Sequence, residues 1–297
     1  MTGPVLVVGD VMTDVITAVD YPLALGSDTA ARIQTRQGGA GPNVACWLAA
    51  AGVPVVFVGV AGADPFGTEA QLALTAAGVD ARLRLTPDAA TGTCVVLVGG
   101  DGERTMLPDA GANSLLRPDD LPRDLVAAAA HLHLSGYSLL NPGSRAAAVS
   151  ALRLASAAGV PTSVDPASSA PLEAVGPDAF RGLTEGVSLV FVTLDEAEVL
   201  CDSRDPVVVG ARLTASYEQV VVKLGERGAR WFSRQEPAGV EVAAATPPGP
   251  VVDTTGAGDA FAAAWLAAQR RGEEPKVALR KATEAAALVV TRVGARP

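Results

Sequence analysis

The sequence contains few cysteines, histidines, lysines and aromatic residues. Among its 297 residues, 3 are cysteine, 2 are histidine and only 4% are aromatic. The three cysteines are far apart and form no CxxC or Cys/His pattern, which argues against a zinc site or a disulfide framework and favours a reducing, cytoplasmic setting. With so few aromatic rings, we expect a core of Ala, Val and Leu, and few pockets lined by stacked rings.

Positive charge and long apolar runs are also scarce. The formal net charge of -9 argues against a nucleic-acid or anionic-membrane partner, because either would be repelled. The first apolar stretch is short and follows no basic segment, so we expect neither a signal peptide nor a membrane helix there. An acidic protein that binds an anion must use main-chain N–H groups, helix N-termini, a few basic side chains and a divalent metal.

Short continuous apolar runs alternate along the chain with Ala-rich segments of helical length. Such runs are typical of buried strands in a parallel sheet, and their alternation with helices predicts a doubly wound, mostly parallel α/β sheet flanked by helices. In such a sheet, ligands bind at the carboxyl ends of the strands. The runs that we assign to strands span residues 5–9, 55–59, 131–136, 161–165, 187–193 and 219–225.

Two stretches break this rhythm. Residues 31–37 and 91–107 alternate polar and apolar residues, and a glycine cluster at 99–102 predicts a hairpin turn. We expect a small antiparallel β flap, or lid, with strands inserted at about 14–37 and 91–108 of a single domain that spans residues 1–297. Exposed strand edges favour pairing with another copy, so a homodimer through the lid is expected, as is closure of the lid over a substrate.

Residues 253–259 read Asp-Thr-Thr-Gly-Ala-Gly-Asp and precede an apolar, Ala-rich run. This pattern predicts a loop that leads into the N-terminus of a buried helix, where unpaired N–H groups attract anions and glycines allow a phosphate to approach closely. The helix end should lower the pKa of Asp259 and keep it ionised, so that it can accept a proton from an attacking alcohol. The alternative is a tight turn in which Asp259 only caps the helix.

A second glycine cluster weakens that alternative. Gly38, Gly39 and Asn43 again precede a helical segment. With Ala45 they match the amino-terminal GG…N…A motif of the PfkB or ribokinase-like carbohydrate kinases, which the sequence resembles over essentially its whole length. The carboxy-terminal DTxGAGD signature of that family is matched at residues 253–259, and residues 62–67 are similar to its G-x-D-x-x-G stretch.

The resemblance implies a role for each matching residue. It makes Asp259 the catalytic base and Asp14 the carboxylate that binds substrate hydroxyls, since an ionised carboxylate can accept from two of them at once. The remaining implied positions are Gly256, Ala257 and Gly258 in an anion hole, Thr254 and Thr255 near the nucleotide phosphates, and Met12, Gly38, Gly39 and Asn43 around the substrate.

The resemblance also implies ATP and Mg²⁺ as cofactors. Lys223, Gly225 and Gly228 match a turn beside the nucleotide, and Glu196 matches the family residue that positions Mg²⁺ through water. Thr193 stands where the family motif has Asn, which is a departure. A monovalent cation such as K⁺, bound by main-chain carbonyls near residues 290–295, is left open.

His131 and His133 alternate on one expected strand and so face the same side. They could form part of a metal site. No third ligand follows at a suitable spacing, so we favour buried, hydrogen-bonded structural histidines.

The expected reaction is transfer of the γ-phosphoryl group of ATP to a hydroxyl, most simply a primary hydroxymethyl, of a sugar such as ribose, fructose or a keto-sugar acid. Ala40 and Met12 differ from residues common in ribose-specific relatives, which argues against a narrow ribokinase. The alternatives are a nucleoside kinase of the adenosine, cytidine or pseudouridine type, and a catalytically silent sugar-binding regulator. The intact Asp259 and its glycine loop argue against the regulator.

Overall fold

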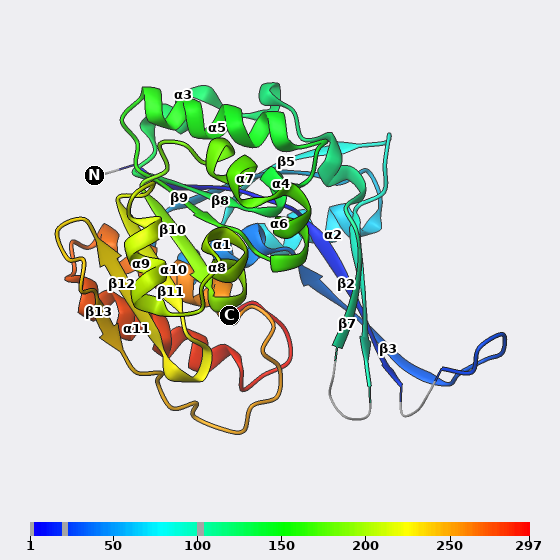
Figure 1. Ribbon diagram of the computed structural model, residues 1–297. Helices are drawn as coiled ribbons and strands as arrows, with labels where there is room; N and C mark the ends of the chain where they lie inside the picture. The colour runs from blue at the N-terminus through cyan, green and yellow to red at the C-terminus, as the bar shows by residue number, and fades with distance from the viewer. Residues whose placement is uncertain (1–2, 20–22, 100–103) are drawn as a thin grey trace.

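The structure is a computed structural model that describes residues 3–19, 23–99 and 104–297. Within these residues it contains a nine-stranded sheet, helices on both faces of that sheet, and a separate four-stranded sheet that projects from one edge (Figure 1). The small sheet is the lid expected from the sequence. The described residues include no helix that is both long and apolar enough to cross a bilayer.

The large sheet has the order β13-β12-β11-β10-β9-β8-β1-β4-β5. Neighbouring strands from β5 to β11 are parallel, and only the β11–β12 and β12–β13 pairs are antiparallel. This confirms the predicted doubly wound, mostly parallel sheet. Its strands are β1 (Val5–Val8), β4 (Val55–Gly62), β5 (Asp80–Thr86), β8 (His131–Ser135), β9 (Thr162–Asp165), β10 (Leu189–Thr193), β11 (Gln219–Lys223), β12 (Ala229–Ser233) and β13 (Val240–Val242).

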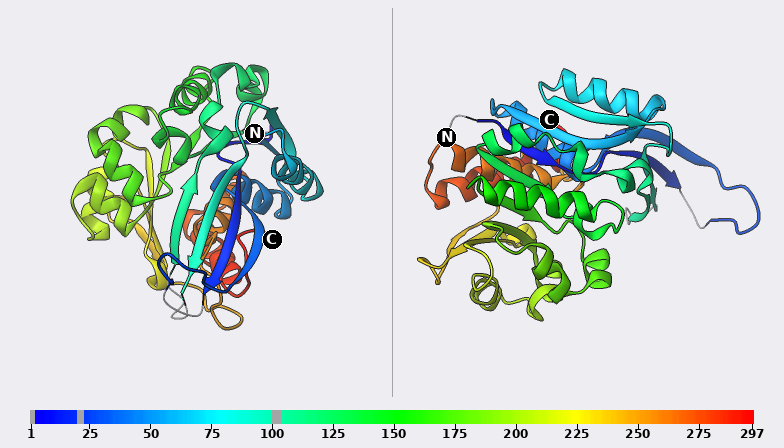
Figure 2. Two further views of the ribbon diagram at one scale, coloured as in Figure 1. Left: turned by 90° about the vertical axis from the view of Figure 1, so that its right-hand side faces the viewer. Right: turned by 90° about the horizontal axis from the view of Figure 1, so that it is seen from above.

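Helices cover both faces of the large sheet (Figure 2). One face packs against α1 (Ala40–Ala50), α2 (Pro65–Ala76), α10 (Ala257–Arg270) and α11 (Pro275–Val289). The other packs against α3 (Arg123–Ala128), α4 (Tyr137–Leu140), α5 (Arg145–Ala157), α6 (Ser169–Val175), α7 (Pro177–Leu183), α8 (Leu194–Cys201) and α9 (Pro206–Leu213). Three short 3₁₀ helices complete the described elements: η1 (Gly111–Leu115), η2 (Pro118–Asp120) and η3 (Gly225–Arg227).

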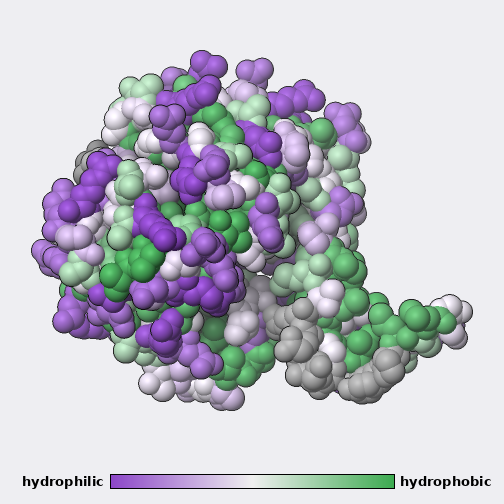
Figure 3. Space-filling view, viewed as in Figure 1, coloured by the Kyte–Doolittle hydropathy of each residue, from purple (hydrophilic) through white to green (hydrophobic). Residues whose placement is uncertain are grey.

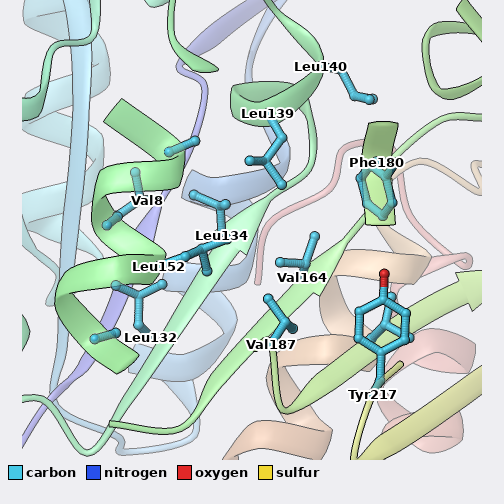
Figure 4. Close-up of a cluster of buried hydrophobic side chains, with 14 of the residues drawn as sticks. Val8, Leu132, Leu134, Leu139, Leu140, Leu152, Val164, Phe180, Val187 and Tyr217 are labelled. Atoms are coloured by element: carbon cyan, nitrogen blue, oxygen red, sulfur yellow. The ribbon is translucent and has the colours of Figure 1, made fainter. Parts of the chain in front are cut away.

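The core is aliphatic, as the composition predicted. Leu132, Leu134 and Val164 lie on one side of the sheet and pack against Leu139 and Leu152 of the covering helices (Figure 4). Burying a side chain of this size contributes about 1.5–3 kcal/mol relative to leaving it exposed. Because the central strands are buried on both faces, they read as continuous apolar runs in the sequence.

The lid consists of β2 (Met12–Val19), β3 (Ala31–Gly38), β6 (Gly92–Val98) and β7 (Arg104–Asp109), in the order β3-β2-β6-β7. The two outer pairs are antiparallel, as expected, whereas β2 and β6 are parallel. They are parallel because β2 and β6 follow the parallel strands β1 and β5 and leave the same edge of the large sheet. The glycine cluster at 99–102 lies almost entirely outside the described residues.

Two side chains attach the lid to the body. Asn113 accepts a hydrogen bond from the main-chain N–H of Val11 at 2.7 Å and donates one to the carbonyl of Val11 at 2.8 Å. Asp64 accepts from the N–H of Thr91 at 2.8 Å and from its hydroxyl at 2.7 Å. These bonds hold the start of β2 and the start of β6, so the lid's position relative to the large sheet is defined at two strands.

Candidate active site

The candidate active site lies at the carboxyl edge of the large sheet, beneath the lid. The last residues of three neighbouring parallel strands, Asp165, Thr193 and Lys223, reach this edge. Helices α1 and α10 begin beside it, at Ala40 and Ala257. The edge therefore combines strand ends, two helix N-termini and the lid, as expected for a ligand site in this class of fold.

The loop before α10 has a conformation that glycine permits. Gly256 is the N-cap of the helix and has φ +79°, and a Cβ atom there would lie 2.4 Å from Cβ of Ala295. Asp253 fixes the loop by accepting hydrogen bonds from the N–H groups of Thr255 at 2.7 Å and Gly294 at 3.1 Å.

The start of α10 leaves donors free. The main-chain N–H groups of Gly258 and Asp259 donate to no acceptor within the described parts of the chain. Together with Gly256 and Ala257 they stand where the sequence predicts a backbone cradle for an anion, although the N–H of Ala257 donates to the carbonyl of Thr254 at 3.3 Å. Thr254, exposed, and Thr255, half-buried, stand at the mouth of this cradle.

Asp259 lies in the first turn of α10 and is held by Asn43 of α1. The side-chain amide of Asn43 donates to Oδ2 of Asp259 at 2.9 Å. Burial raises the pKa of Asp259 to about 7, and the carboxylates of Asp165 and Asp10 act in the same direction, while Asn43 and Lys223 act against it. The expectation of a lowered pKa is therefore wrong, because lost hydration outweighs the helix end and the nearby ammonium.

The substrate side of the site is built by β2 and β3. Asp14 on β2 pairs with Arg36 on β3, and Gly38 ends β3 two residues after Arg36. The Asp14 carboxylate lies against Gly38, since a Cβ atom on Gly38 would be 2.5 Å from Oδ2 of Asp14. Burial raises the pKa of Asp14 to about 6; Asp10 adds to the rise, and Arg296 reduces it. A carboxylate in this setting can accept hydrogen bonds from substrate hydroxyls.

A small cavity of about 20 Å³ lies between the lid and the loop before α10. Asp14 of the lid and Thr255 of the loop both line it, so the expected substrate and phosphate sides face the same space. Gly39 begins α1 with φ +92°, and a Cβ there would lie 2.2 Å from the carbonyl oxygen of Asp10. Met12 is buried at the base of the lid, with its sulfur 3.4 Å from Nδ2 of Asn113.

Lys223 lies under the loop before α10. Its ammonium donates to Oδ2 of Asp165 at 2.6 Å, and a Cβ atom on Gly258 would lie 3.4 Å from it. Burial alone would lower the pKa of Lys223, but Asp165 and Glu196 raise it overall. Lys223 is thus a paired cation next to the phosphate cradle.

The chain turns sharply after Lys223. Gly225 has φ +61° and Gly228 has φ +107°, and a Cβ on Gly228 would lie 2.1 Å from the carbonyl oxygen of Val242. The turn places this loop at the outer end of the same sheet edge. Gly225, Glu226 and Arg227 are exposed, whereas Gly228 is buried.

Glu196 and Thr193 form a capping box at the start of α8. The main-chain N–H of Thr193 donates to Oε2 of Glu196 at 2.7 Å, and the hydroxyl of Thr193 accepts from the N–H of Glu196 at 3.3 Å. Thr193, which stands where the family motif has Asn, thus caps the helix. Burial raises the pKa of Glu196, and Lys223 opposes the rise. No group of three or more His, Cys, Asp or Glu side chains in the described ranges could hold a metal unaided.

Four residues near the site were missed by the sequence reasoning. Asp10 accepts a hydrogen bond from Ser135 at 2.9 Å, and Arg296 donates to Asn43 at 3.2 Å. Asp10 and Asp165 end or follow expected strands, which was a usable signal. No pattern in the sequence distinguishes Arg296 or Tyr137 from other residues. Burial raises the pKa of Tyr137, and the charges of Asp10 and Asp259 act on it in the same direction.

The two histidines have structural partners. Nε2 of His131 and Nδ1 of His133 each lie 2.8 Å from the hydroxyl oxygen of Ser163. Burial lowers the pKa of His131 to about 3 and that of His133 to about 4, so both are neutral. This arrangement supports the structural interpretation.

The site combines free N–H groups at a helix N-terminus, a carboxylate beside them and a second carboxylate on a strand of the lid. These features define a phosphotransferase with an alcohol group as acceptor. The chain belongs to the pfkB family of carbohydrate kinases, whose family profile matches residues 3–297.

Individual relatives agree with this assignment. The fructokinase of Klebsiella pneumoniae is 33% identical over 279 residues, which cover 90% of this chain and 84% of that protein. The adenosine kinase from Sinorhizobium meliloti superposes with a TM-score of 0.91 at 26% identity, covering 100% of this chain and 96% of that one. Arabidopsis thaliana ribokinase complexed with ribose and ATP gives a TM-score of 0.85 at 27% identity, covering 99% and 95%. They confirm the predicted family and the ribokinase-like fold.

Proposed function

We propose that this protein transfers the γ-phosphoryl group of MgATP to a primary hydroxyl of a neutral sugar, with Asp259 as the general base. One observation carries the proposal: Asp259 is oriented by Asn43 beside the free N–H groups that begin α10. An alcohol placed against Asp259 would lose its proton to the carboxylate as its oxygen attacks a phosphoryl group held in the cradle.

The N–H groups around Gly256, Ala257 and Gly258 would stabilise the charge that develops on the transferred phosphoryl group. Thr254 and Thr255, with the Lys223–Gly228 turn, would contact the nucleotide. Glu196 would position Mg²⁺ through water, with the carboxylate of Asp165 close enough to act on Glu196, because Mg²⁺ commonly binds few protein carboxylates together with phosphate oxygens and water. The metal would neutralise part of the negative charge on the phosphates of ATP.

The electrostatics of the pocket favour a neutral acceptor. Asp10, Asp14 and Asp259 are close enough for Asp10 to raise the pKa of both other carboxyls. A sugar acid or sugar phosphate would add another negative charge to this group, whereas vicinal hydroxyls can donate to Asp14. The similarity to fructokinases supports a ketose such as fructose as the first substrate to assay.

A nucleoside is the second candidate. The structural match to the Sinorhizobium meliloti adenosine kinase favours it. Tyr137, a residue 37% accessible whose hydroxyl is the more buried part, would offer its ring to a base or to a sugar ring.

The test is ADP release from MgATP with a panel of fructose, ribose, adenosine, cytidine, pseudouridine, 2-keto-3-deoxygluconate and fructose 1-phosphate. We expect a neutral sugar to give the highest kcat/KM. The highest value with the acid or the phosphate would contradict the neutral-sugar proposal, and no stimulation by any acceptor would favour the silent regulator.

We further propose that two copies associate through the lid. Ile33 and Leu107 are 64% and 53% exposed and, by strand register, lie on the lid face opposite Asp14. Hydrophobic residues gather on the projecting lid in the space-filling view (Figure 3). Sedimentation of the wild type and Ile33→Lys tests this: a dimer lost in the variant supports it, and a monomeric wild type contradicts it. A cytoplasmic location and a K⁺ requirement stay predictions; assays in K⁺ and in tetramethylammonium test the latter.

A further inference from the structure

We infer that Arg296 is a positioning residue that fixes the orientation of the Asn43 side-chain amide and thereby directs its N–H toward Asp259. The inference rests on the proposed function of Asp259 as the base. None of the matched family motifs includes Arg296, which lies next to the last residue of the sequence. It reaches the site only through the fold.

The hydrogen bonds run in one direction. Nε of Arg296 donates to Oδ1 of Asn43 at 3.2 Å, and Nδ2 of Asn43 donates to Oδ2 of Asp259 at 2.9 Å. A guanidinium can only donate and an ionised carboxylate can only accept. If the amide were flipped, its NH₂ would face the guanidinium and its oxygen would face the carboxylate, so both contacts would become repulsive. Arg296 therefore selects the flip that serves Asp259.

Arg296 is itself held in place on several sides. Nη2 donates to the carbonyl of Gly38 at 2.9 Å, which ties the guanidinium to the end of lid strand β3. The preceding residue is anchored to α1, because Nε1 of Trp47 donates to the carbonyl of Ala295 at 2.8 Å. Gly294 donates to Asp253 of the phosphate loop at 3.1 Å. The segment thus links lid, α1 and loop at the point where Asn43 meets the base.

The hydrogen bond from Asn43 is one of the interactions that limit the rise in the pKa of Asp259. A base must be ionised to accept a proton, so weakening this bond should move the acidic limb of the pH profile upward. Arg296 also acts on Asp259 directly through its charge, an effect that does not pass through Asn43 and that the double variant detects. Other groups act on Asp259 from the elements around it and stay in place when Arg296 is changed. They are Lys223 of β11, Asp165 of β9, Asp10 after β1 and Tyr137 of α4.

The variants separate positioning from simple charge and from substrate contact. Arg296→Met removes the donor, Asn43→Leu removes the amide, and the double variant removes both. Arg292→Met is the matched control, since it deletes a cation of the same segment that lies over Trp47, 5.3 Å from the ring centre. Arg296→Lys keeps a charge and a donor and should restore part of the loss.

The measurement is kcat/KM and kcat against pH with the best acceptor found for the wild type. We expect Arg296→Met to lower kcat about tenfold and to raise the apparent pKa of the acidic limb by about half a unit or more, with the acceptor KM changed less than threefold. Asn43→Leu should raise the apparent pKa of the acidic limb by the same amount. The double variant should raise it no further, because both changes break the same chain of contacts. Arg292→Met should keep the wild-type profile.

An unshifted limb in Arg296→Met, additive shifts in the double variant, or an effect confined to the acceptor KM would overturn the inference. A ¹³C NMR titration of the Asp carboxyl carbons without substrate, assigned with Asp259→Asn, gives an independent readout. If the wild type phosphorylates nothing, the proposed function fails. A higher Asp259 pKa in Arg296→Met, with no further rise when that change is added to Asn43→Leu, would still support the contact chain. An unchanged pKa, or an equal rise in the Asn43→Leu background, would refute it.

Discussion

The ammonium of Lys223 and the carboxylate of Asp165 form an ion pair at 2.6 Å beside the start of α10. Both side chains are only 13–14% exposed. Strands β9 and β11 both flank β10, so the pair spans the width of one strand. Removing Lys223 leaves the buried Asp165 without this cation. Removing Asp165 leaves the buried Lys223 without its hydrogen-bonded partner, with only the charges of Glu196 and Asp259 acting on it from nearby.

We therefore predict that Lys223→Met and Asp165→Asn each lower the free energy of unfolding by about 3 kcal/mol. The double variant Lys223→Met/Asp165→Asn should be closer to the wild type than either single variant. Urea unfolding at pH 7 measures all four proteins. Additive losses in the double variant would show that the two groups do not interact in the folded protein.

Replacing Asp259 should stabilise the protein at alkaline pH. The pKa of Asp259 is about 7 in the folded protein against 3.8 for an unperturbed Asp, so the folded state favours the protonated form. Its contribution to stability is fully present below pH 3.8 and is lost as the pH rises through about 7. We expect Asp259→Asn to unfold with a free energy about 2 kcal/mol higher than the wild type at pH 8, with a smaller difference at pH 5. An equal difference at both pH values would refute the raised pKa.

Ala167 has a strained backbone beside the site. Its φ is +72°, a conformation that favours glycine, and its N–H donates to Oδ1 of Asp165 at 3.1 Å. Ala167→Gly should therefore raise the free energy of unfolding by about 1 kcal/mol, since relief of strain outweighs the added freedom of the unfolded chain. Ala170→Gly, in the exposed part of α6, is the control and should lower it by a similar amount. Thermal unfolding of the two variants compares them; destabilisation by both would contradict a strained Ala167.

Asp14 should affect acceptor binding far more than nucleotide binding. Asp14→Asn keeps the shape beside Gly38 but loses the acceptor-only carboxylate that hydroxyls would use. We expect the acceptor KM to rise more than about tenfold while the KM for ATP changes little, because one charge-assisted hydrogen bond contributes about 1.5–3 kcal/mol. Steady-state kinetics with each substrate varied in turn measures the two KM values. A rise in the KM for ATP equal to that for the acceptor would show that Asp14 does not bind the acceptor specifically.

The parallel sheet, the lid and the two glycine loops could be predicted because each leaves a local pattern. Continuous apolar runs mark strands buried on both faces, and Gly256 is needed where a positive φ and the nearby Ala295 leave no space for a Cβ. The parallel pairing of β2 with β6 could not be predicted, because it depends on which strands of the large sheet they follow. The role of Arg296 was equally hidden, since 253 residues separate it from Asn43 in the chain.

The electrostatics of the site were also beyond sequence reasoning. A helix N-terminus alone lowers the pKa of a carboxyl, so the pattern at Asp259 suggested an ionised side chain. The structure adds burial and the two further carboxylates of Asp165 and Asp10, and their combined effect reverses the direction. Such a balance depends on three-dimensional neighbours that no spacing of residues records.

The central claim is that Asp259 removes the proton from the attacking hydroxyl. The most direct measurement is kcat for Asp259→Asn with the best acceptor, alongside the dissociation constant for ATP measured by calorimetry. We expect a fall in kcat of about 10²–10⁴-fold with ATP affinity nearly unchanged, because the amide retains the shape but cannot accept the proton. A variant that keeps kcat within tenfold of the wild type would contradict it.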